Sequence, residues 1–340
     1  MTYNSIQILR CVAVISVLIL HSHTAIPREI FFFPFFSQFG WVGVNLFFVI
    51  SGFIIADRIE YERSLRRYLA KRYARVFPLY LILTTVAVLL SSGLDLATFT
   101  LERTDSGAPY DPETLPYLLK SIFIIPQDEW PVLSVGWSLE YEIVFYMTFG
   151  IAYFAGGRSA ALFAMLVLTL AGILFTDLTR PVLDPVFTYF LMGCLAREAV
   201  ARDLRAVIRS APVVFVLGGT AATLHLYKAV DLSSLGFTVV AALAFAALLI
   251  WMVELERTEK AFQHRNIFTL IGDMSFSLYL VHWIIMPLSQ SLTTGVSFSD
   301  TGAEIVRLVA IMMSLLASWT VWKYVETPIN TRRRDVLDSR

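Results

Sequence analysis

Charged side chains are scarce in this sequence, and this scarcity excludes an ordinary soluble domain. Only 16% of the 340 residues are charged, whereas soluble domains carry about 25%. Hydrophobic residues make up 57% of the chain, and the mean hydropathy is +0.67. The composition therefore predicts a polytopic membrane protein, built as an all-α bundle of transmembrane helices.

Cysteine is scarce as well. The two cysteines, Cys11 and Cys194, fall inside apolar segments, which argues against a disulfide framework and against a zinc site. We expect no metal site and no nucleic-acid partner. A cleavable signal peptide is not predicted either, because the first apolar run contains Arg10 and lacks a small-residue cleavage site behind a basic region.

Long apolar stretches predict about ten membrane spans. The apolar segment 115–125 is too short to cross, so we expect it to be interfacial or re-entrant. We expect one transmembrane domain over 1–330 and a short basic cytoplasmic tail over 331–340. The spans are expected, to within a few residues, at 6–26, 40–57, 74–92, 133–154, 159–176, 182–197, 211–227, 234–253, 268–289 and 303–324.

Lysine and arginine are distributed unevenly between the two sides of these spans. With ten spans and both termini on one side, 6 of the 27 basic residues fall on the opposite side. Because basic residues concentrate on the cytoplasmic side of a membrane, both termini are predicted to be cytoplasmic and the acidic loop 93–132 to face outward. The six basic residues of the outer side are Arg28, Arg103, Lys120, Arg180, Lys228 and Arg307.

Arg10 and His21 lie eleven residues apart in the first span. Eleven residues make three helical turns, so both side chains fall on one stripe, roughly 16 Å apart. Ionisable residues inside a span are functional candidates by default, and histidine is well suited to move a proton near neutral pH. The stripe predicts a polar path into the membrane. The alternative is that Arg10 snorkels to the interface and His21 makes a polar contact between helices.

A second pair of arginines, Arg72 and Arg75, precedes Pro78 where the chain re-enters the membrane. Their spacing places both on one helical face. Because guanidinium groups bind phosphate in a bidentate manner, the pair predicts an anionic ligand at the cytoplasmic mouth of the polar path. Membrane topology and binding of anionic lipid explain part of the basic stretch 58–75.

The second and fourth spans each open with a distinctive segment. The stretch GWVGVNLFFVISGF at 40–53 has small residues at spacings that favour close helix packing. Asn45 within it needs a polar partner, and we expect it to turn toward His21. The fourth span begins VGWSLEYEIVFY, where Glu140 is expected to be a first-turn helix carboxylate. Glu142 is deeper and therefore the stronger functional candidate.

The ninth span contains MSFSLYLVHW at 274–283. It places several polar side chains, including Tyr279 and His282, within one membrane segment. A single intramembrane histidine such as His282 more often makes a structural hydrogen bond than acts in catalysis. After the tenth span, VETPI puts Glu326 and Pro328 at the cytoplasmic exit, and we expect the helix to stop there.

Together these stretches resemble the acyltransferase-3 family, multispan bacterial inner-membrane enzymes that O-acylate sugars of surface polysaccharides. The resemblance covers nearly the whole chain, and the IQILR opening and VGWSLEYEIVFY are most similar to the exopolysaccharide-acetylating branch. It rests on five stretches in order, namely Arg10 with His21, GWVGVNLFFVISGF, the Arg72/Arg75 pair, WSLEYEIVFY, and SFSLYLVHW followed by VETPI.

The resemblance implies roles for individual residues. His21 would be the essential histidine, with Arg10 as its partner. Arg72 and Arg75 would form the arginine pair on the acyl-donor side, and Glu142 the acidic position of the tryptophan-serine-leucine motif. The sequence departs from the family pattern where Asn45 replaces a commonly acidic residue, Phe276 a common tyrosine and Thr327 a frequent basic residue.

The implied reaction takes an acyl group from acyl-CoA, most simply acetyl-CoA, to a hydroxyl of a polysaccharide or lipid-linked sugar. Arg72, Arg75 and Arg10 would hold the phosphates of the donor. His21 would either deprotonate the hydroxyl or carry the acyl group itself, and the sequence leaves both routes open. The residues expected on the acceptor side are Trp137, Ser138, Asn45, Tyr279 and His282.

Two other classes of protein would also place polar residues in spans. A transporter of a small polar solute or glycan intermediate predicts internal repeats or paired broken helices, and the sequence shows neither. A lipid-linked glycosyltransferase would need a substantial soluble domain or an outer acidic pair. Asp105 and Asp111 are the only candidates for such a pair, and they look like solvated turn residues.

Overall fold

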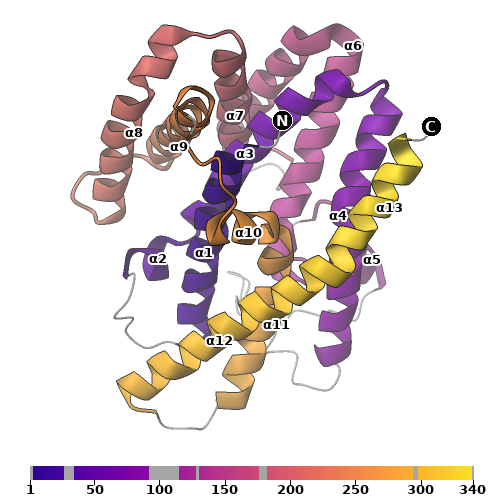
Figure 1. The fold of residues 1–340 in the computed structure, drawn as a ribbon, viewed down its shortest axis with the longest axis vertical. Helices are drawn as coiled ribbons and strands as arrows, with labels where there is room; N and C mark the ends of the chain where they lie inside the picture. The colour runs from indigo at the N-terminus through magenta and orange to yellow at the C-terminus, as the bar shows by residue number, and fades with distance from the viewer. Residues whose placement is uncertain are drawn as a thin grey trace. The chain divides into compact units, whose positions relative to one another are not determined.

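The protein is helical throughout its described parts. The computed structural model describes residues 3–26, 34–91, 115–127, 130–175, 182–259, 261–293 and 298–338. Every regular element in these ranges is a helix (Figure 1), which confirms the all-α prediction. Most of the expected outer loop, including Asp105 and Asp111, lies outside them, as do Arg28, Arg103 and Arg180.

Several of the described helices are long and apolar enough to cross a membrane. There are seven in the described ranges, or eight if α10 (Ile267–Asp273) and α11 (Ser275–Thr293) form one broken span. This supports a multi-pass membrane protein, while the count of ten and the side of the termini remain predictions. The segment expected to be interfacial or re-entrant is α5 (Leu115–Phe123), nine residues long.

The chain divides into two compact units. The first comprises Met1–Ala13, Val42–Leu69 and Tyr141–Asp273. Within it α3 packs against α7, and α9 packs against both α7 and α8. Besides α10 and the ends of α1 and α4, its helices are α3 (Val42–Arg58), η1 (Ile59–Tyr61), most of α6 (Trp137–Leu174), α7 (Phe187–Ala201), α8 (Arg205–Leu226) and α9 (Ser234–Thr258).

The second unit comprises Val14–Trp41, Ala70–Glu140 and Met274–Arg340. Within it α11 packs against α12 and against the short helix η3. Besides α5, α11 and the first turn of α6, its helices are most of α1 (Asn4–Ala25), α2 (Pro34–Phe39), most of α4 (Leu65–Ser91), η3 (Ser134–Gly136), α12 (Asp300–Val321), η4 (Trp322–Glu326) and α13 (Thr327–Asp338).

The long helix α6 is broken at the boundary expected between the fourth and fifth spans. Gly156 and Gly157 leave helical geometry there, and Gly157 has a φ of 73°. Only glycine adopts that region without strain. The two glycines therefore divide α6 into two helical segments, and the break lies between the segments 133–154 and 159–176 that the sequence suggested.

Helices α3 and α7 approach so closely that only glycine fits at two points of contact. A Cβ added to Gly52 would lie 2.2 Å from the carbonyl oxygen of Phe190, and one added to Gly193 would lie 2.0 Å from that of Val49. The packing role expected for the 40–53 segment is thus confirmed at Gly52. Gly193 is the matching small residue on α7.

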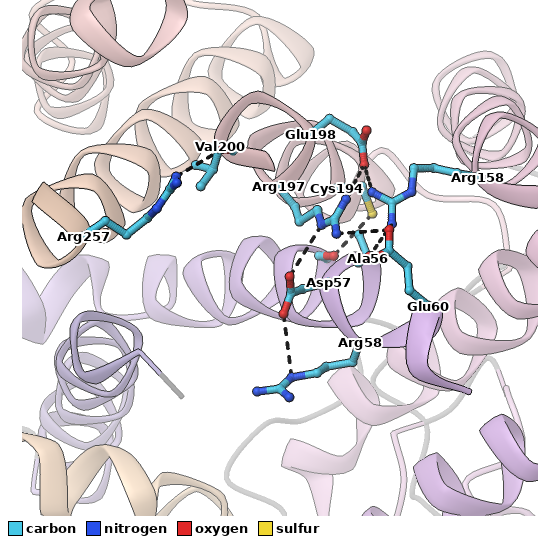
Figure 2. A network of polar contacts seen from close by, with 11 residues as sticks. Ala56, Asp57, Arg58, Glu60, Arg158, Cys194, Arg197, Glu198, Val200 and Arg257 are labelled. Atoms are coloured by element: carbon cyan, nitrogen blue, oxygen red, sulfur yellow. Dashed lines mark hydrogen bonds and ion pairs between the residues drawn. The ribbon is translucent and has the colours of Figure 1, made fainter. Parts of the chain in front are cut away.

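A network of ion pairs joins η1, α6 and α7 with the end of α3 (Figure 2). Arg197 is 9% exposed and lies 3.6 Å from Asp57, 3.1 Å from Glu60 and 3.2 Å from Glu198. Arg158 pairs with Glu60 and Glu198 as well. Because each buried charge meets opposite charges, the network holds these ends together without leaving an unpaired ion.

The expectation of a helix stop at Glu326 and Pro328 was wrong. A π-helical turn, η4, covers Trp322–Glu326, and α13 continues from Thr327 to Asp338. In the π turn the N–H of Thr327 bonds to the carbonyl of Trp322, five residues back. Such a wider turn makes room for the ring of the following proline, which lacks an N–H to donate. The segment expected as a tail is therefore helical as far as Asp338.

Candidate active site

The two intramembrane histidines singled out in the sequence form a direct pair. His21 on α1 and His282 on α11 lie with Nδ1 of His21 2.8 Å from Nε2 of His282. The ring planes differ by 13°, and the ring centroids are 5.0 Å apart. The sequence placed His282 on the acceptor side and did not predict that it is the hydrogen-bond partner of His21.

Aromatic side chains enclose this pair. The ring of Trp283 meets that of His21 edge-on at a centroid distance of 4.7 Å, and the ring of Tyr279 lies 5.9 Å from that of His282. His282 has no exposed surface, whereas His21 is only half-buried. Of the two histidines, only His21 keeps some exposed surface.

Tyr279 and Ser138 connect α11 to the start of α6. Their hydroxyl oxygens are 2.9 Å apart, and each hydroxyl lies 3.1 Å from the carbonyl oxygen of Val135. Both were expected on the acceptor side. Their hydrogen bonds fix η3 and the first turn of α6 against the helix that carries His282.

The end of α1 that carries His21 is held at two points. A Cβ on Gly40 would lie 2.1 Å from the carbonyl oxygen of Ser16, so only glycine permits this approach to α1. Arg307 on α12 is buried, pairs with Glu304, and donates to the carbonyl of Ile26 at 2.8 Å. Carbonyls at a helix C-terminus lack partners within the helix, and Arg307 supplies one. The sequence feature that could have pointed to Arg307 is its spacing of three residues from Glu304, which puts the two charges on one face of a helix.

Glu142 and Asn45 lie in the first unit. The hydroxyl of Ser51 donates to Oε1 of Glu142 at 2.8 Å, and Tyr146 donates to the same oxygen. Glu142 thus connects α6 to the serine of the 40–53 segment on α3. Asn45 is buried and interacts with the hydroxyl of Tyr189.

Two further carboxylates are buried in the second unit. Glu326 in the π turn accepts a 2.6 Å hydrogen bond from the hydroxyl of Ser277 on α11. Glu140 lies in the first turn of α6, as expected, but is only 2% exposed. Its Oε1 has no hydrogen-bond partner among the described residues. The sequence ranked Glu140 below Glu142, because depth along a span does not reveal which face of the helix is covered.

The expected donor arginines lie on α4. Arg72 and Arg75 are both half-buried. Arg333 on α13 donates to the carbonyl of Lys71 at 3.2 Å, so the helical end of the chain lies beside this basic segment. Arg10 is half-buried on α1 and donates to Gln7 at 3.1 Å. The described residues contain no cluster of metal-ligating side chains.

Trp137 is the remaining residue expected on the acceptor side. It lies at the first position of α6, and its ring meets that of Trp130 edge-on at a centroid distance of 6.0 Å. The contacts described above bring His21, His282, Tyr279 and Ser138 together within the second unit.

Comparison with known proteins shows which family the chain belongs to. Residues 3–323 match the acyltransferase domain family. The chain is 27% identical over 314 residues to the exopolysaccharide production protein ExoZ of Rhizobium meliloti (strain 1021), covering 87% of this chain and 91% of that protein. It is 24% identical over 334 residues to the acyltransferase MdmB of Streptomyces mycarofaciens, covering 88% and 84%.

A shorter match is also present. The chain is 37% identical to the putative acetyltransferase ORF330 of Acidianus two-tailed virus over 51 residues, or 15% of this chain and 16% of that protein. No solved structure matches significantly. The family match spans nearly the whole sequence, including the stretches that carry His21, Glu142 and His282. The chain therefore belongs to the acyltransferase-3 family, and it is an acyltransferase.

Proposed function

We propose that this protein transfers an acyl group from cytoplasmic acyl-CoA to a hydroxyl of an exopolysaccharide or another cell-surface glycan. Acetyl-CoA is the simplest donor, and a bacterial inner membrane is the expected location. The observation that carries the proposal is the half-buried His21, held at 2.8 Å against His282 in a chain of an acyltransferase family. The name of one relative, an exopolysaccharide production protein, supports the acceptor class.

The donor fits the basic segment of α4. The nucleotide part of acyl-CoA carries several phosphate charges, and guanidinium groups bind such oxygens with charge-assisted hydrogen bonds. Arg72 and Arg75 supply two of these groups, with Lys71 next to them in sequence and Arg333 beside Lys71. On the predicted orientation this segment faces the cytoplasm, where acyl-CoA is made. Arg10, near the same face on that orientation, is the third candidate for a phosphate contact.

The chemistry needs a base at the acceptor hydroxyl. An imidazole nitrogen of His21 takes the proton as the hydroxyl oxygen forms a bond to the thioester carbonyl carbon. The carbon–sulfur bond then breaks, and the CoA thiolate takes the proton from His21 and leaves as the thiol. In the covalent route the same nitrogen accepts the acyl group and releases the thiolate. The hydroxyl oxygen then takes the acyl group, and its proton goes to the thiolate.

His21→Ala tests this proposal. A strain lacking the protein is complemented with wild-type or variant protein, and the surface polysaccharide is analysed by mass. We expect wild-type protein to add acyl groups, and His21→Ala to lose transfer by roughly 10²–10⁴-fold, the usual contribution of a positioned general base. The matched control is His23→Ala, which removes a second histidine of α1. Near-normal acylation by a His21→Ala protein that still binds acetyl-CoA would contradict the role of His21.

A further inference from the structure

The hydrogen atoms of the histidine pair can be assigned from its partners. Nδ1 of His282 lies 2.9 Å from the carbonyl oxygen of Leu278, one helical turn earlier. A carbonyl oxygen only accepts hydrogen bonds. Nδ1 of His282 must therefore carry a hydrogen and donate it to Leu278.

The other nitrogen of His282 then acts as an acceptor. His282 has no exposed surface, and none of its contacts among the described residues is with a carboxylate. Burying an unpaired charge is costly, so His282 is neutral. A neutral imidazole with its hydrogen on Nδ1 has a lone pair on Nε2. That lone pair faces Nδ1 of His21 at 2.8 Å, so Nδ1 of His21 carries the hydrogen that joins the rings.

The ring geometry agrees with this assignment. The planes are nearly parallel at 13°, but the centroids are 5.0 Å apart. The distance between the centroids exceeds the 2.8 Å between the two nitrogens by about two ring radii, where a ring radius is the distance from a centroid to its own nitrogen. The two nitrogens therefore lie close to the line that joins the centroids, as in a linear N–H···N hydrogen bond and unlike face-to-face stacking.

We infer that His282 is a positioning residue that holds His21 in the tautomer with hydrogen on Nδ1 and leaves Nε2 of His21 as the reacting atom. The inference rests on the proposed role of His21. His282 itself is fully enclosed, so it acts through His21 and not on a substrate. In both routes above, the atom that takes the proton or the acyl group is Nε2.

The pair also explains how a positive charge on His21 is tolerated. When Nε2 takes the proton of the hydroxyl, His21 becomes an imidazolium ion. Its Nδ1–H bond to His282 is then charge-assisted and stronger than in the neutral pair. The proton leaves Nε2 for the thiolate, and the hydrogens on both Nδ1 atoms stay where they were. The pair is therefore back in its starting state after each turnover.

Two replacements of His282 separate positioning from packing. The terminal oxygen of glutamine reaches the place of Nε2, so His282→Gln keeps an acceptor for His21. The terminal amide of asparagine reaches only the place of Nδ1, so His282→Asn keeps the contact with Leu278 and removes that acceptor. We expect His282→Gln to keep transfer within about tenfold of wild type and His282→Asn to lose about 10²-fold, since a base in the wrong tautomer is a poor base. Equal activity of the two variants would overturn the inference.

A spectroscopic measurement tests the tautomer without any assay of transfer. The chain has five histidines, so ¹⁵N labelling of histidine in membranes gives few ring signals. Those of His21 and His282 are assigned from the spectra of His21→Ala and His282→Asn. We expect hydrogen on Nδ1 of both rings in the wild type, and a shift of His21 toward the Nε2–H form in His282→Asn.

The outcomes of the two proposals remain distinct. Hydrogen on Nε2 of His21 in the wild-type protein would overturn the inference about His282, whatever the activity of any variant. Retained transfer by His21→Ala would overturn the role of His21 and leave the tautomer measurement standing. Thermal stabilisation by acetyl-CoA shows whether each variant is folded and binds donor. If His282→Asn does not fold, the wild-type spectrum and His282→Gln still decide.

Discussion

The two arginines proposed to bind the donor differ in exposure from a second arginine pair in the same basic stretch. Arg72 and Arg75 are half-buried, whereas Arg63 and Arg66, with the same spacing a few residues earlier, are exposed. All four contribute equally to the charge that orients the membrane protein. Arg72 and Arg75 are the pair proposed to contact phosphate, so the exposed pair Arg63 and Arg66 serves as their comparison.

Replacing Arg72 and Arg75 by alanine should weaken acyl-CoA binding. Each loses a charge-assisted contact worth roughly 1.5–3 kcal/mol, so we expect the dissociation constant for acetyl-CoA to rise by at least about tenfold. It is measured by thermal stabilisation of the purified protein over a range of acetyl-CoA concentrations. The matched control is the double variant of Arg63 and Arg66, which removes the same charge at the same spacing. Equal effects of both double variants would reduce Arg72 and Arg75 to topology signals.

The sequence singled out candidate residues of the site but not their contacts. His21 became a candidate because an ionisable group inside an apolar span is expensive. Its pairing with His282 was not found, because 261 positions separate them and the periodicity of one helix says nothing of which face another helix presents. The hydrogen bond between Ser51 and Glu142 was not predicted for the same reason.

At the scale of helices, the contact between α3 and α7 depends on the absence of side chains. The backbone of each helix occupies the place where a Cβ of the other would lie, at Gly52 and at Gly193. Overpacked positions typically lose about 1–3 kcal/mol, and here the clash is with backbone atoms that cannot rotate away.

Gly193→Ala should therefore lower the melting temperature of the purified protein. Gly219→Ala on α8 is the control, since its added Cβ would meet no atom closer than 3.9 Å. Alanine favours a helix over glycine by up to about 1 kcal/mol, so the control should melt at the same temperature or higher. A Gly193→Ala protein as stable as wild type would show that the two helices can separate at no cost.

Helix boundaries were predictable where glycine marks them and not where a proline is accommodated. The break in α6 at Gly156 and Gly157 fell where two spans were expected to meet. The stop at Pro328 did not occur, because the π turn before it provides the wider spacing. Nothing in the sequence distinguishes a proline that ends a helix from one that follows a π turn, since the difference lies in backbone geometry.

At the scale of the whole molecule, the distribution of charge predicts that distant segments share one side of the membrane. Arg58, Arg197 and Arg257 come from three basic clusters that the sequence assigns to the same side. In the first unit Arg58 lies near Asp57 at 3.7 Å, Arg197 pairs with Asp57, and Arg257 donates to Val200 at 3.2 Å (Figure 2). The network supports a common side for the three clusters.

Topology mapping decides both the side and the number of spans. An even number, such as ten, puts both termini on one side, whereas an odd number, such as the seven long apolar helices, puts them on opposite sides. Because basic residues concentrate inside, a reporter fused after Arg340 should be cytoplasmic, one fused before Met1 should be cytoplasmic too, and a tag near Asp105 should be reached from outside.

Each reporter has a distinct consequence for the proposed reaction. If the two terminal reporters lie on opposite sides of the membrane, the number of spans is odd and ten spans are excluded. A C-terminus outside the cytoplasm would also place α13 and the adjacent Lys71, joined to it through Arg333, away from the acyl-CoA pool. The arginines of α4 could then not receive a cytoplasmic donor, even if His21 proved essential. Cytoplasmic signals at both termini, with the tag accessible only from outside, put the basic segment where the donor is made and the outer ends of the spans where surface glycans are exported.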